Sequence, residues 1–413
     1  MQEIHSTCQG ESHKATNKVC QDYSYVEITN DLTIAVVCDG HGGERYFRSD
    51  IGSKVAAEVT AECMRLFIEG IDKNIFLGKP FTQHNALSTE VKNNDYHKGT
   101  EVEKVMRQLF SSIIYNWREK ILSHAIANPL TENEVAVVPQ KAQQEFANNV
   151  GHEKTYGCTL MCYVQTADYW LAFHIGDGKC IAFDEEGRWL EPIPWDDKCF
   201  LNKTTSLCDS SAIDEFRFCY ASDGSFPLSV FLGSDGIDDS FGETPNMINF
   251  YVQILKTIAK SSVEEAKASL EEALPELSKI GSKDDMSVVC VFDENRLSDV
   301  VPQLIGWQRN NIKEQIDAIN SKIQSLYEKK KIIEDKQIKE KKDKIDFDYT
   351  VKDIDRSFKI KESLISKYDK FSRELSPESF VPYSDGICPE NKDLEESTND
   401  ITEQQPVPYK EEE

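Results

Sequence analysis

Short apolar runs separated by polar, glycine-rich stretches make up roughly the first 300 residues. The runs are rich in β-branched and aromatic residues and end at Gly or Asp, which is typical of β-strands. They cover residues 32–39, 157–164, 169–177, 179–189, 214–222, 229–236 and 286–294. The runs between 157 and 189 follow one another after short polar turns, which favours antiparallel pairing.

Longer segments between these runs have a helical period. Apolar residues recur at three- and four-residue steps over 44–69, 101–127 and 245–277, which predicts amphipathic helices. Strands and helices of this kind bury their apolar faces by packing in layers. The pattern therefore predicts an α+β protein in which two antiparallel sheets pack together and are flanked by helices.

The pattern changes after residue 300. Isoleucines and leucines between Ile312 and Ile333 alternate three- and four-residue steps, as in the a/d seam of a coiled coil, and a second helical run spans 350–375. We predict a helical hairpin or coiled-coil extension over residues 301–375. Segment 303–375 could pack on itself, on the main domain or on a second copy. The sequence is therefore compatible with a homo-oligomer or a protein partner that binds through residues 303–375. A charged helical appendage without a partner is the alternative.

The last segment is acidic and rich in Pro, Ser, Thr and Glu. Because such a composition buries too little apolar surface to order a chain, we predict an acidic disordered tail over residues 376–413. Residues 1–300 then form the main domain. The net charge of -25 is divided unevenly, with -20 on residues 1–302, +4 on 303–375 and -9 on the tail.

Charge and composition exclude several classes of function. Binding of nucleic acid through phosphate contacts needs a basic face, whereas this main domain is acidic. No apolar stretch approaches the ~20 residues that span a bilayer, and the N-terminal residues lack the features of a secretory signal. The 12 cysteines include no Cys-x-x-Cys pair, which favours free thiols in a reducing compartment. We therefore expect a cytoplasmic protein that binds neither nucleic acid nor membranes.

Aspartates stand at the ends of several predicted strands, in most cases beside a glycine. Each alone is typical of a turn. The set comprises Asp22, Asp39, Asp177, Asp235 with the nearby Asp239, and Asp284. If the strand ends converge, the carboxylates form a dense negative cluster, which is costly unless it is neutralised. Mg²⁺ and Mn²⁺ suit such a cluster because they prefer oxygen ligands, whereas zinc favours His or Cys ligands.

Taken in order, these segments resemble the motifs of the metal-dependent protein phosphatases of type 2C. The resemblance covers roughly residues 1–295 and includes every main motif. The matching segments are Gln21-Asp22, Asp39-Gly40-His41-Gly42-Gly43, Gly157-Cys158-Thr159, Gly176-Asp177, Asp235-Gly236-Ile237-Asp238-Asp239 and Asp284-Asp285-Met286-Ser287. The residues that open the chain favour a bacterial-type branch of that family.

The resemblance implies a four-layer α-β-β-α sandwich with two Mn²⁺ or Mg²⁺ ions at one end of the sheets. The implied metal ligands are Asp22 through water, Asp39 as the bridge, the Gly40 carbonyl, Asp235 and Asp284, with Asp177 and Asp239 at positions that hold a third, weaker ion in some members.

The activity that the resemblance implies is hydrolysis of phosphoserine and phosphothreonine in a phosphorylated protein substrate. A water or hydroxide that bridges the two ions would attack the phosphorus. His41 matches the residue thought to protonate the leaving alcohol, which helps because an alkoxide is a poor leaving group. His41 and Asp39 are thus the candidate catalytic residues.

The chain departs from the family pattern at the phosphate-binding position. Members usually place an arginine shortly before the first aspartate, and here that place is Asn17. Lys18 beside it and His13 upstream are the candidate substrate-binding residues, but lysine lacks the bidentate fork of arginine. Gln21 replaces a glutamate and Asp285 an asparagine. The alternative function is therefore a catalytically weak or inactive phosphatase-like scaffold that acts through its C-terminal helices.

Overall fold

The computed structural model describes residues 1–85, 99–200, 203–335 and 341–384, and the chain divides into two units. The first unit comprises residues 1–308 and the second begins at Arg309. In the described ranges, no helix is long and apolar enough to cross a membrane.

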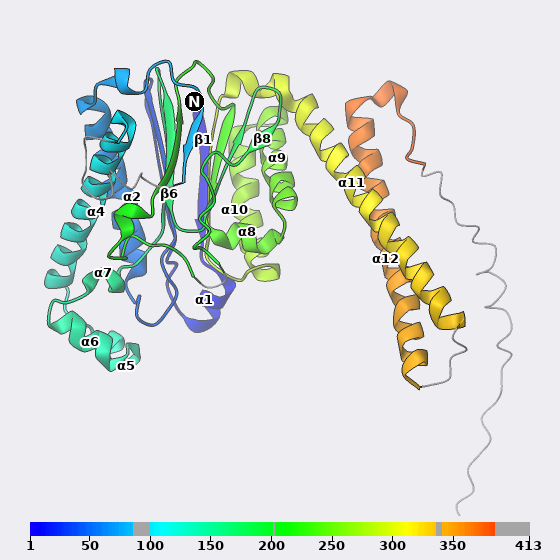
Figure 1. The fold of residues 1–413 in the computed structure, drawn as a ribbon, viewed down its shortest axis with the longest axis horizontal. Coiled ribbons are helices and arrows are strands. Elements are labelled where there is room, and N and C mark those ends of the chain that lie inside the picture. Colours follow the sequence, from blue (N-terminus) through cyan, green and yellow to red (C-terminus); the bar gives the residue numbers. More distant parts are fainter. Residues whose placement is uncertain (86–98, 201–202, 336–340, 385–413) are drawn as a thin grey trace, which may run out of the picture. The chain divides into compact units, whose positions relative to one another are not determined.

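Two β-sheets form the centre of the first unit (Figure 1). Their strands pair in antiparallel fashion throughout. The first sheet has the order β1 (Gln2–Cys8), β11 (Met286–Phe292), β10 (Ser229–Gly233), β7 (Lys179–Phe183) and β8 (Trp189–Leu190). The second has the order β2 (Tyr23–Ile28), β3 (Leu32–Cys38), β5 (Leu160–Thr166), β6 (Trp170–Ile175), β9 (Arg217–Ala221) and β4 (Thr82–His84).

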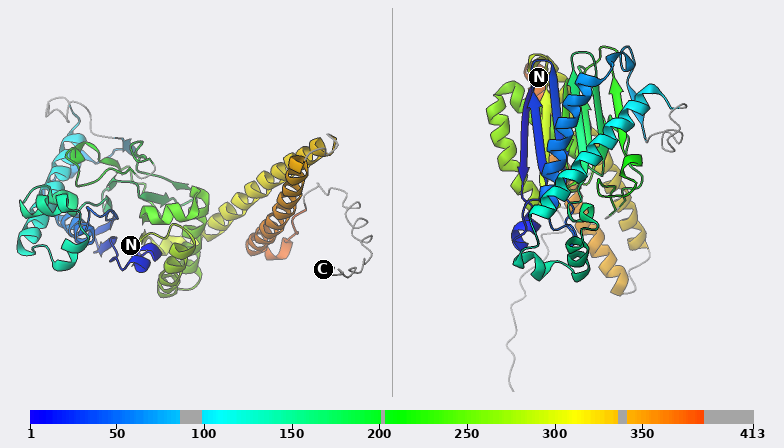
Figure 2. Two further views of the ribbon diagram at one scale, coloured as in Figure 1. Left: turned by 90° about the horizontal axis from the view of Figure 1, so that it is seen from below. Right: turned by 90° about the vertical axis from the view of Figure 1, so that its left-hand side faces the viewer.

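Helices cover the outer face of each sheet, as the views of Figure 2 show. The second sheet is covered by α2 (Ser49–Gly70) and α4 (Glu101–Ala127), and the first by α9 (Thr244–Lys260) and α10 (Val263–Ile280). Shorter helices are α1 (Glu11–Thr16), α5 (Glu132–Val137), α6 (Gln140–Ala147), α7 (His152–Thr155) and α8 (Asp235–Phe241), with 3-10 turns at Lys73–Ile75, Ala212–Asp214 and Pro377–Ser379.

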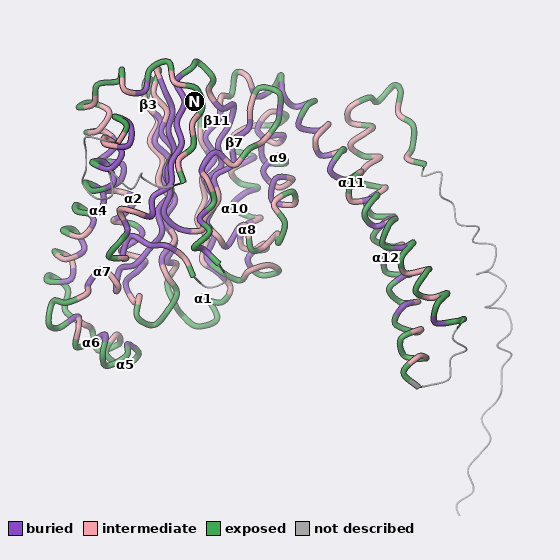
Figure 3. Tube along the Cα trace, in the orientation of Figure 1, coloured by how far each residue is buried: buried purple, intermediate pink, exposed green. Residues whose placement is uncertain are grey.

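Three apolar clusters fill the spaces between these four layers. Val36 packs toward the helices on the second sheet, whereas its neighbour Val37 packs between the two sheets with Leu232 and Val289. Phe231 belongs to the cluster under the other helices. Successive side chains point to opposite faces of a strand, so a strand with packing on both faces is a continuous apolar run. Figure 3 shows this burial along the central strands. The predicted four-layer sandwich is confirmed.

The fold differs from the expectation in several details, including a divided helix and the unexpected strands β1 and β4. The helix expected over 245–277 is divided into α9 and α10, because Ser262 caps a new helix by accepting a hydrogen bond from the Glu265 backbone N–H. Strand β1 was not expected. It lies at the edge of its sheet beside β11, and Ile4 is its one buried residue, so its sequence shows little apolar pattern.

The second unit contains the predicted C-terminal helical extension. Helix α11 (Glu294–Asp335) begins in the first unit and continues into the second, where α12 (Lys341–Leu375) follows. The predicted seam on α11 faces α12. The contacting residues are Ile312, Ile316, Ile319 and Ile323 with Phe358, Leu364, Ile365, Tyr368 and Phe371. Helix α11 is continuous across residue 300, where we placed the domain boundary. That boundary stays a prediction.

The predicted disordered tail starts at residue 376, and residues 376–384 are the part of it that the structure describes. Tyr383 stacks edge-on against Tyr368 at 5.1 Å, and its backbone N–H donates to the Asp369 carboxylate at 2.7 Å. An aromatic side chain therefore attaches this part of the acidic segment. The rest of the predicted tail, residues 385–413, lies outside the described residues.

Candidate active site and metal centre

Strand ends converge at one edge of the two sheets. Asp39 follows β3, Asp177 follows β6, Asp235 follows β10, and Asp284 precedes β11. Antiparallel neighbours bring the end of one strand beside the start of the next, so these residues meet although they are far apart in sequence. Six predicted site residues line one open pocket of about 870 Å³: Asp39, Gly40, His41, Asp177, Asp235 and Asp284.

Asp22 and Asp239 lie at the margin of this cluster. Asp22 is 6% exposed and precedes β2, and its pKa is raised first by burial and then by the charges of Asp285, Asp235 and Asp284. Asp239 lies on α8, and burial together with the charges of Asp238 and Asp284 raises its pKa. Both carboxyls are therefore electrostatically part of the cluster, although neither is among the pocket-lining residues.

Burial and mutual repulsion disfavour ionisation of the pocket carboxyls. Burial, followed by the charges of Asp235 and Asp22, raises the pKa of Asp39 well above its usual value. Burial, followed by the charges of Asp177 and Asp284, raises the pKa of Asp235 to about 7. In the described part of the chain, Asp22 Oδ2 and Asp235 Oδ1 are buried without a hydrogen-bond partner. Unpartnered carboxylate oxygens in a buried cluster match the ligand preference of Mg²⁺ and Mn²⁺.

The side chains alone do not form a closed cage. Among the described residues, no group of three or more His, Cys, Asp or Glu side chains is already arranged to hold an ion. Mg²⁺ commonly keeps several waters and takes only one or two carboxylates in enzyme sites. The donor set therefore fits a hard, partly hydrated divalent cation.

The turn after β3 is held tightly by backbone contacts. The Thr159 N–H donates to the Asp39 carbonyl at 2.8 Å, the Gly40 N–H to the Gln21 carbonyl at 3.1 Å, and the His41 N–H to the Gly157 carbonyl at 3.1 Å. A Cβ at Gly40 would lie 2.5 Å from the Gln21 carbonyl oxygen. Glycine is thus required here by the close approach of two backbone segments, which sets the direction of the Asp39 side chain.

His41 projects from this turn into the pocket wall. Its Nε2 lies 2.7 Å from Ser206 Oγ, and its ring meets the ring of Tyr46 edge-on at 4.8 Å. Burial lowers the pKa of His41 to about 4. The imidazole of the metal-free protein is therefore neutral at neutral pH.

Sequence reasoning missed a segment that lines the same pocket as the aspartates. It follows β8 and contributes Lys198, Lys203, Thr204, Thr205, Ser206, Cys208 and Asp209 to the lining. The segment has no strand or helix period and matches none of the motifs above. Its polar side chains gave no distinguishing signal, and the contact of Ser206 with His41 joins residues 165 positions apart.

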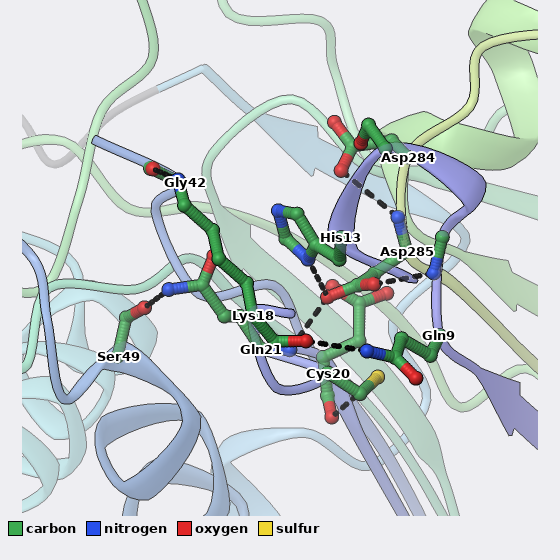
Figure 4. A network of polar contacts seen from close by, with 12 residues as sticks. Gln9, His13, Lys18, Cys20, Gln21, Gly42, Ser49, Asp284 and Asp285 are labelled. Carbon is green, nitrogen blue, oxygen red and sulfur yellow. Dashed lines mark hydrogen bonds and ion pairs between the residues drawn. The ribbon is translucent and has the colours of Figure 1, made fainter. Parts of the chain in front are cut away.

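Asp285 is the centre of a separate polar network beside the pocket (Figure 4). Its carboxylate accepts hydrogen bonds from the Gly10 N–H at 2.6 Å, from the Gln21 N–H, and from His13 Nδ1 at 2.9 Å. Burial would raise the pKa of Asp285, but these donors outweigh it and the pKa is lowered. Asp285 therefore joins α1, the segment before β2, and β11.

The two predicted substrate-binding residues belong to this neighbourhood. His13 is 7% exposed and paired with Asp285. Lys18 is exposed, and its ammonium donates to the Gly42 carbonyl at 2.9 Å. Neither residue lines the pocket. Asn17, at the place of the expected arginine, has a left-handed backbone with φ of 53° and ends α1. A role for His13 or Lys18 in binding substrate stays a prediction.

Comparisons with known proteins were made for both sequence and structure. A search of curated proteins found no significant match. Staphylococcus aureus serine/threonine phosphatase Stp1 shares 12% identity over 71% of this chain and 95% of its own, with a TM-score of 0.40. PppA, a key regulatory component of T6SS in Pseudomonas aeruginosa, shares 14% identity over 70% of this chain and 96% of its own, with a TM-score of 0.39. A Caenorhabditis elegans sex determining protein shares 15% identity over 73% of this chain and 67% of its own, with a TM-score of 0.43.

The family comparison is more specific. The model of the protein phosphatase 2C family matches residues 9–275, well over half of the chain, and includes the segments of Asp22, Asp39, Asp177 and Asp235. The bacterial-type branch stays a prediction. The family match agrees with the order of motifs along the sequence, and the chain belongs to the protein phosphatase 2C family.

Proposed function

We propose that this protein is a metal-dependent phosphoserine/phosphothreonine protein phosphatase. The observation that carries the proposal is one pocket whose lining includes His41 and three carboxyls with raised pKa values, among them those of Asp39 and Asp235. Family membership supports the same reaction class. Phosphate monoester hydrolysis depends mainly on positioning and charge neutralisation, and this pocket offers both.

Two Mn²⁺ or Mg²⁺ ions would be held by Asp39, the Gly40 carbonyl, Asp235 and Asp284, with Asp22 acting through water. Asp177 and Asp239 would serve a third, weaker ion. Bound ions of this kind lower the pKa of water and neutralise phosphoryl oxygens. The protein itself supplies a rigid edge of two sheets, which keeps the carboxylates in place while substrate binds and product leaves.

His41 would deliver the proton that the serine or threonine oxygen needs as it leaves. Its Nδ1 makes no hydrogen bond within the described ranges, so this nitrogen is available to a substrate. Burial lowers the pKa of His41 to about 4, whereas a phosphate dianion in the pocket would raise it, because a nearby negative charge favours the imidazolium. The proton would therefore be taken up together with substrate.

Lysines of the segment after β8 are the basic side chains that line the pocket. Lys198 pairs with Glu215, whereas Lys203 is exposed and makes no ion pair in the part of the chain that the structure describes. We propose that Lys203 supplies a positive charge to the phosphate in place of the expected arginine. The substrate would be a phosphorylated protein.

The rival proposal is a catalytically weak or inactive scaffold, which the absence of the arginine at Asn17 favours. In this reading the helices of residues 303–375 carry the function by binding a partner protein or a second copy. The free thiols of the described cysteines suit a reducing compartment such as the cytoplasm, for either function.

Hydrolysis of p-nitrophenyl phosphate with added Mn²⁺ or Mg²⁺ separates the two proposals. We expect turnover by the wild type that Asp39→Asn abolishes, because the variant loses the bridging carboxylate. A wild type that is no more active than Asp39→Asn, but still retains a phosphopeptide, would favour the scaffold.

A further inference from the structure

His41 has one polar side-chain neighbour that no motif singles out, Ser206, whose Oγ lies 2.7 Å from Nε2. We propose that Ser206 is a positioning residue that fixes the His41 ring and keeps the hydrogen on Nε2, so that Nδ1 faces the substrate. This inference rests on the proposed phosphatase function, because it concerns the proton that the leaving group receives.

The neighbours of Ser206 Oγ decide which atom carries the hydrogen. The Cys158 carbonyl oxygen lies 3.0 Å away and can only accept, and the Cys208 sulfur lies 3.2 Å away. The Cys208 backbone N–H, at 3.3 Å, can only donate. Ser206 has a single hydroxyl hydrogen, which it donates to the Cys158 carbonyl oxygen. The hydroxyl oxygen then accepts hydrogen bonds from the Cys208 N–H and from His41 Nε2–H.

Ser206 is itself held in place by charge. Its backbone N–H donates to Asp209 Oδ2 at 3.1 Å, and the other oxygen of Asp209 accepts from Lys154 Nζ at 3.0 Å. The ion pair fixes the turn that carries Ser206. A chain of contacts therefore runs from Lys154 through Asp209 and Ser206 to His41.

The His41 ring has little freedom to choose another orientation. Tyr46 packs edge-on against it at 4.8 Å. A Cβ at Gly157 would lie 2.9 Å from His41 Cδ2, the ring atom next to Nε2. The ring is thus enclosed on the side of Ser206, and Nδ1 is the nitrogen left without a partner among the described residues.

The proton transfer follows from this orientation. In the imidazolium form both ring nitrogens carry hydrogen. As the attacking water forms its bond to phosphorus, the bond between phosphorus and the ester oxygen breaks. The electron pair of that bond stays on the ester oxygen, which takes the Nδ1 hydrogen. The ring returns to its neutral form with hydrogen on Nε2, still bound to Ser206. Ser206 gives up no proton in this step and only holds the ring.

A comparison of leaving groups tests the inference. p-Nitrophenolate leaves without help from an acid, whereas the threonine alkoxide needs a proton. For Ser206→Ala we expect kcat on a phosphothreonine peptide to fall at least about tenfold, and kcat on p-nitrophenyl phosphate to change less than about twofold. Ser206→Thr should restore peptide turnover because it keeps the hydroxyl. Ser210→Ala, which alters an exposed serine nearby, is the matched control.

Equal losses on both substrates, or no loss on either, would overturn the inference. A measurement that does not depend on turnover tests the inference separately from the proposed function. In protein with ¹⁵N-labelled histidine, we expect His41 to show hydrogen on Nε2 in the wild type and a mixture of tautomers in Ser206→Ala. Hydrogen on Nδ1 in the wild type would refute the role of Ser206 even if the protein is inactive, whereas inactivity with the expected tautomer would refute the phosphatase function alone.

Discussion

At the scale of residues, the pocket concentrates buried carboxyls that oppose one another. Asp39 and Asp235 come from two different sheets, and each raises the energetic cost of ionising the other groups around it. Protonation or a bound cation relieves this cost. The arrangement that suits a bound cation therefore destabilises the metal-free protein, and the free energy of unfolding reports directly on the site.

Removing one of these charges should stabilise the metal-free protein. Asp235 has a folded pKa of about 7 against an ordinary 3.8, so its contribution to stability is full below about pH 4 and is lost as pH rises through 7. For Asp235→Asn without metal at pH 8, we expect the free energy of unfolding to rise by up to roughly 4 kcal/mol.

Urea unfolding from pH 5 to pH 8 with a chelator measures this effect. The wild type should lose more stability over that range than Asp235→Asn, and Mn²⁺ should stabilise only the wild type strongly. Asp31→Asn, at an exposed position, serves as the control. A parallel decline of wild type and Asp235→Asn would show that the Asp235 pKa is not raised.

Removing the Asp285 carboxylate should lower the free energy of unfolding, because hydrogen-bond donors satisfy this carboxylate. Asp285→Ala leaves three buried donors, on Gly10, Gln21 and His13, without their partner. An unsatisfied buried group costs about 1–3 kcal/mol, so we expect a loss of at least roughly 3 kcal/mol in urea unfolding. A loss as small as that of Asp31→Ala would contradict the structural role of Asp285.

At the scale of elements, the sequence pattern located the strands whose ends build the site. Asp39 and Asp235 were found because each follows an apolar run that is buried on both faces. Ser206 could not be found, because its partner His41 is 165 positions away and no period marks the short segment that carries Ser206. The substrate-binding role of His13 stays a prediction, and nothing in the sequence pattern indicated its pairing with Asp285, which directly precedes β11.

The helical extension offers a prediction of its own. Ile316 is fully buried between α11 and α12, whereas Ile332 on the same helix is 55% exposed. A buried charge without a partner is costly, so Ile316→Asp should increase hydrogen exchange throughout the described part of residues 309–375, and Ile332→Asp should not. Turnover of p-nitrophenyl phosphate should be unchanged, because no described residue of the second unit lines the pocket.

A loss of turnover in Ile316→Asp would show that the helices support the pocket. Equal exchange in both variants would show that the seam does not hold α11 and α12 together. The mass of the wild type in solution tells further whether the extension joins a second copy.

At the scale of the whole molecule, residues 1–302 carry the pocket and a net charge of -20, which favours a negative potential around it. Such a field attracts divalent cations and repels acidic substrates, and salt screens it. We expect kcat/KM at low salt to be several-fold higher for a phosphothreonine peptide with basic flanks than for one with acidic flanks, and the two values to converge at high salt. Equal turnover of both peptides at low salt would contradict this prediction.

The central claim is that the convergent aspartates make this chain a metal-dependent phosphatase. Its most direct test is phosphate release from a phosphothreonine peptide, measured against Mn²⁺ concentration for the wild type and Asp39→Asn. We expect release by the wild type that rises with Mn²⁺, stops on chelation and returns when the metal is restored, with none from Asp39→Asn. Phosphate release that does not depend on Mn²⁺ would contradict the claim. Equal release by the wild type and Asp39→Asn at every Mn²⁺ concentration would contradict it as well.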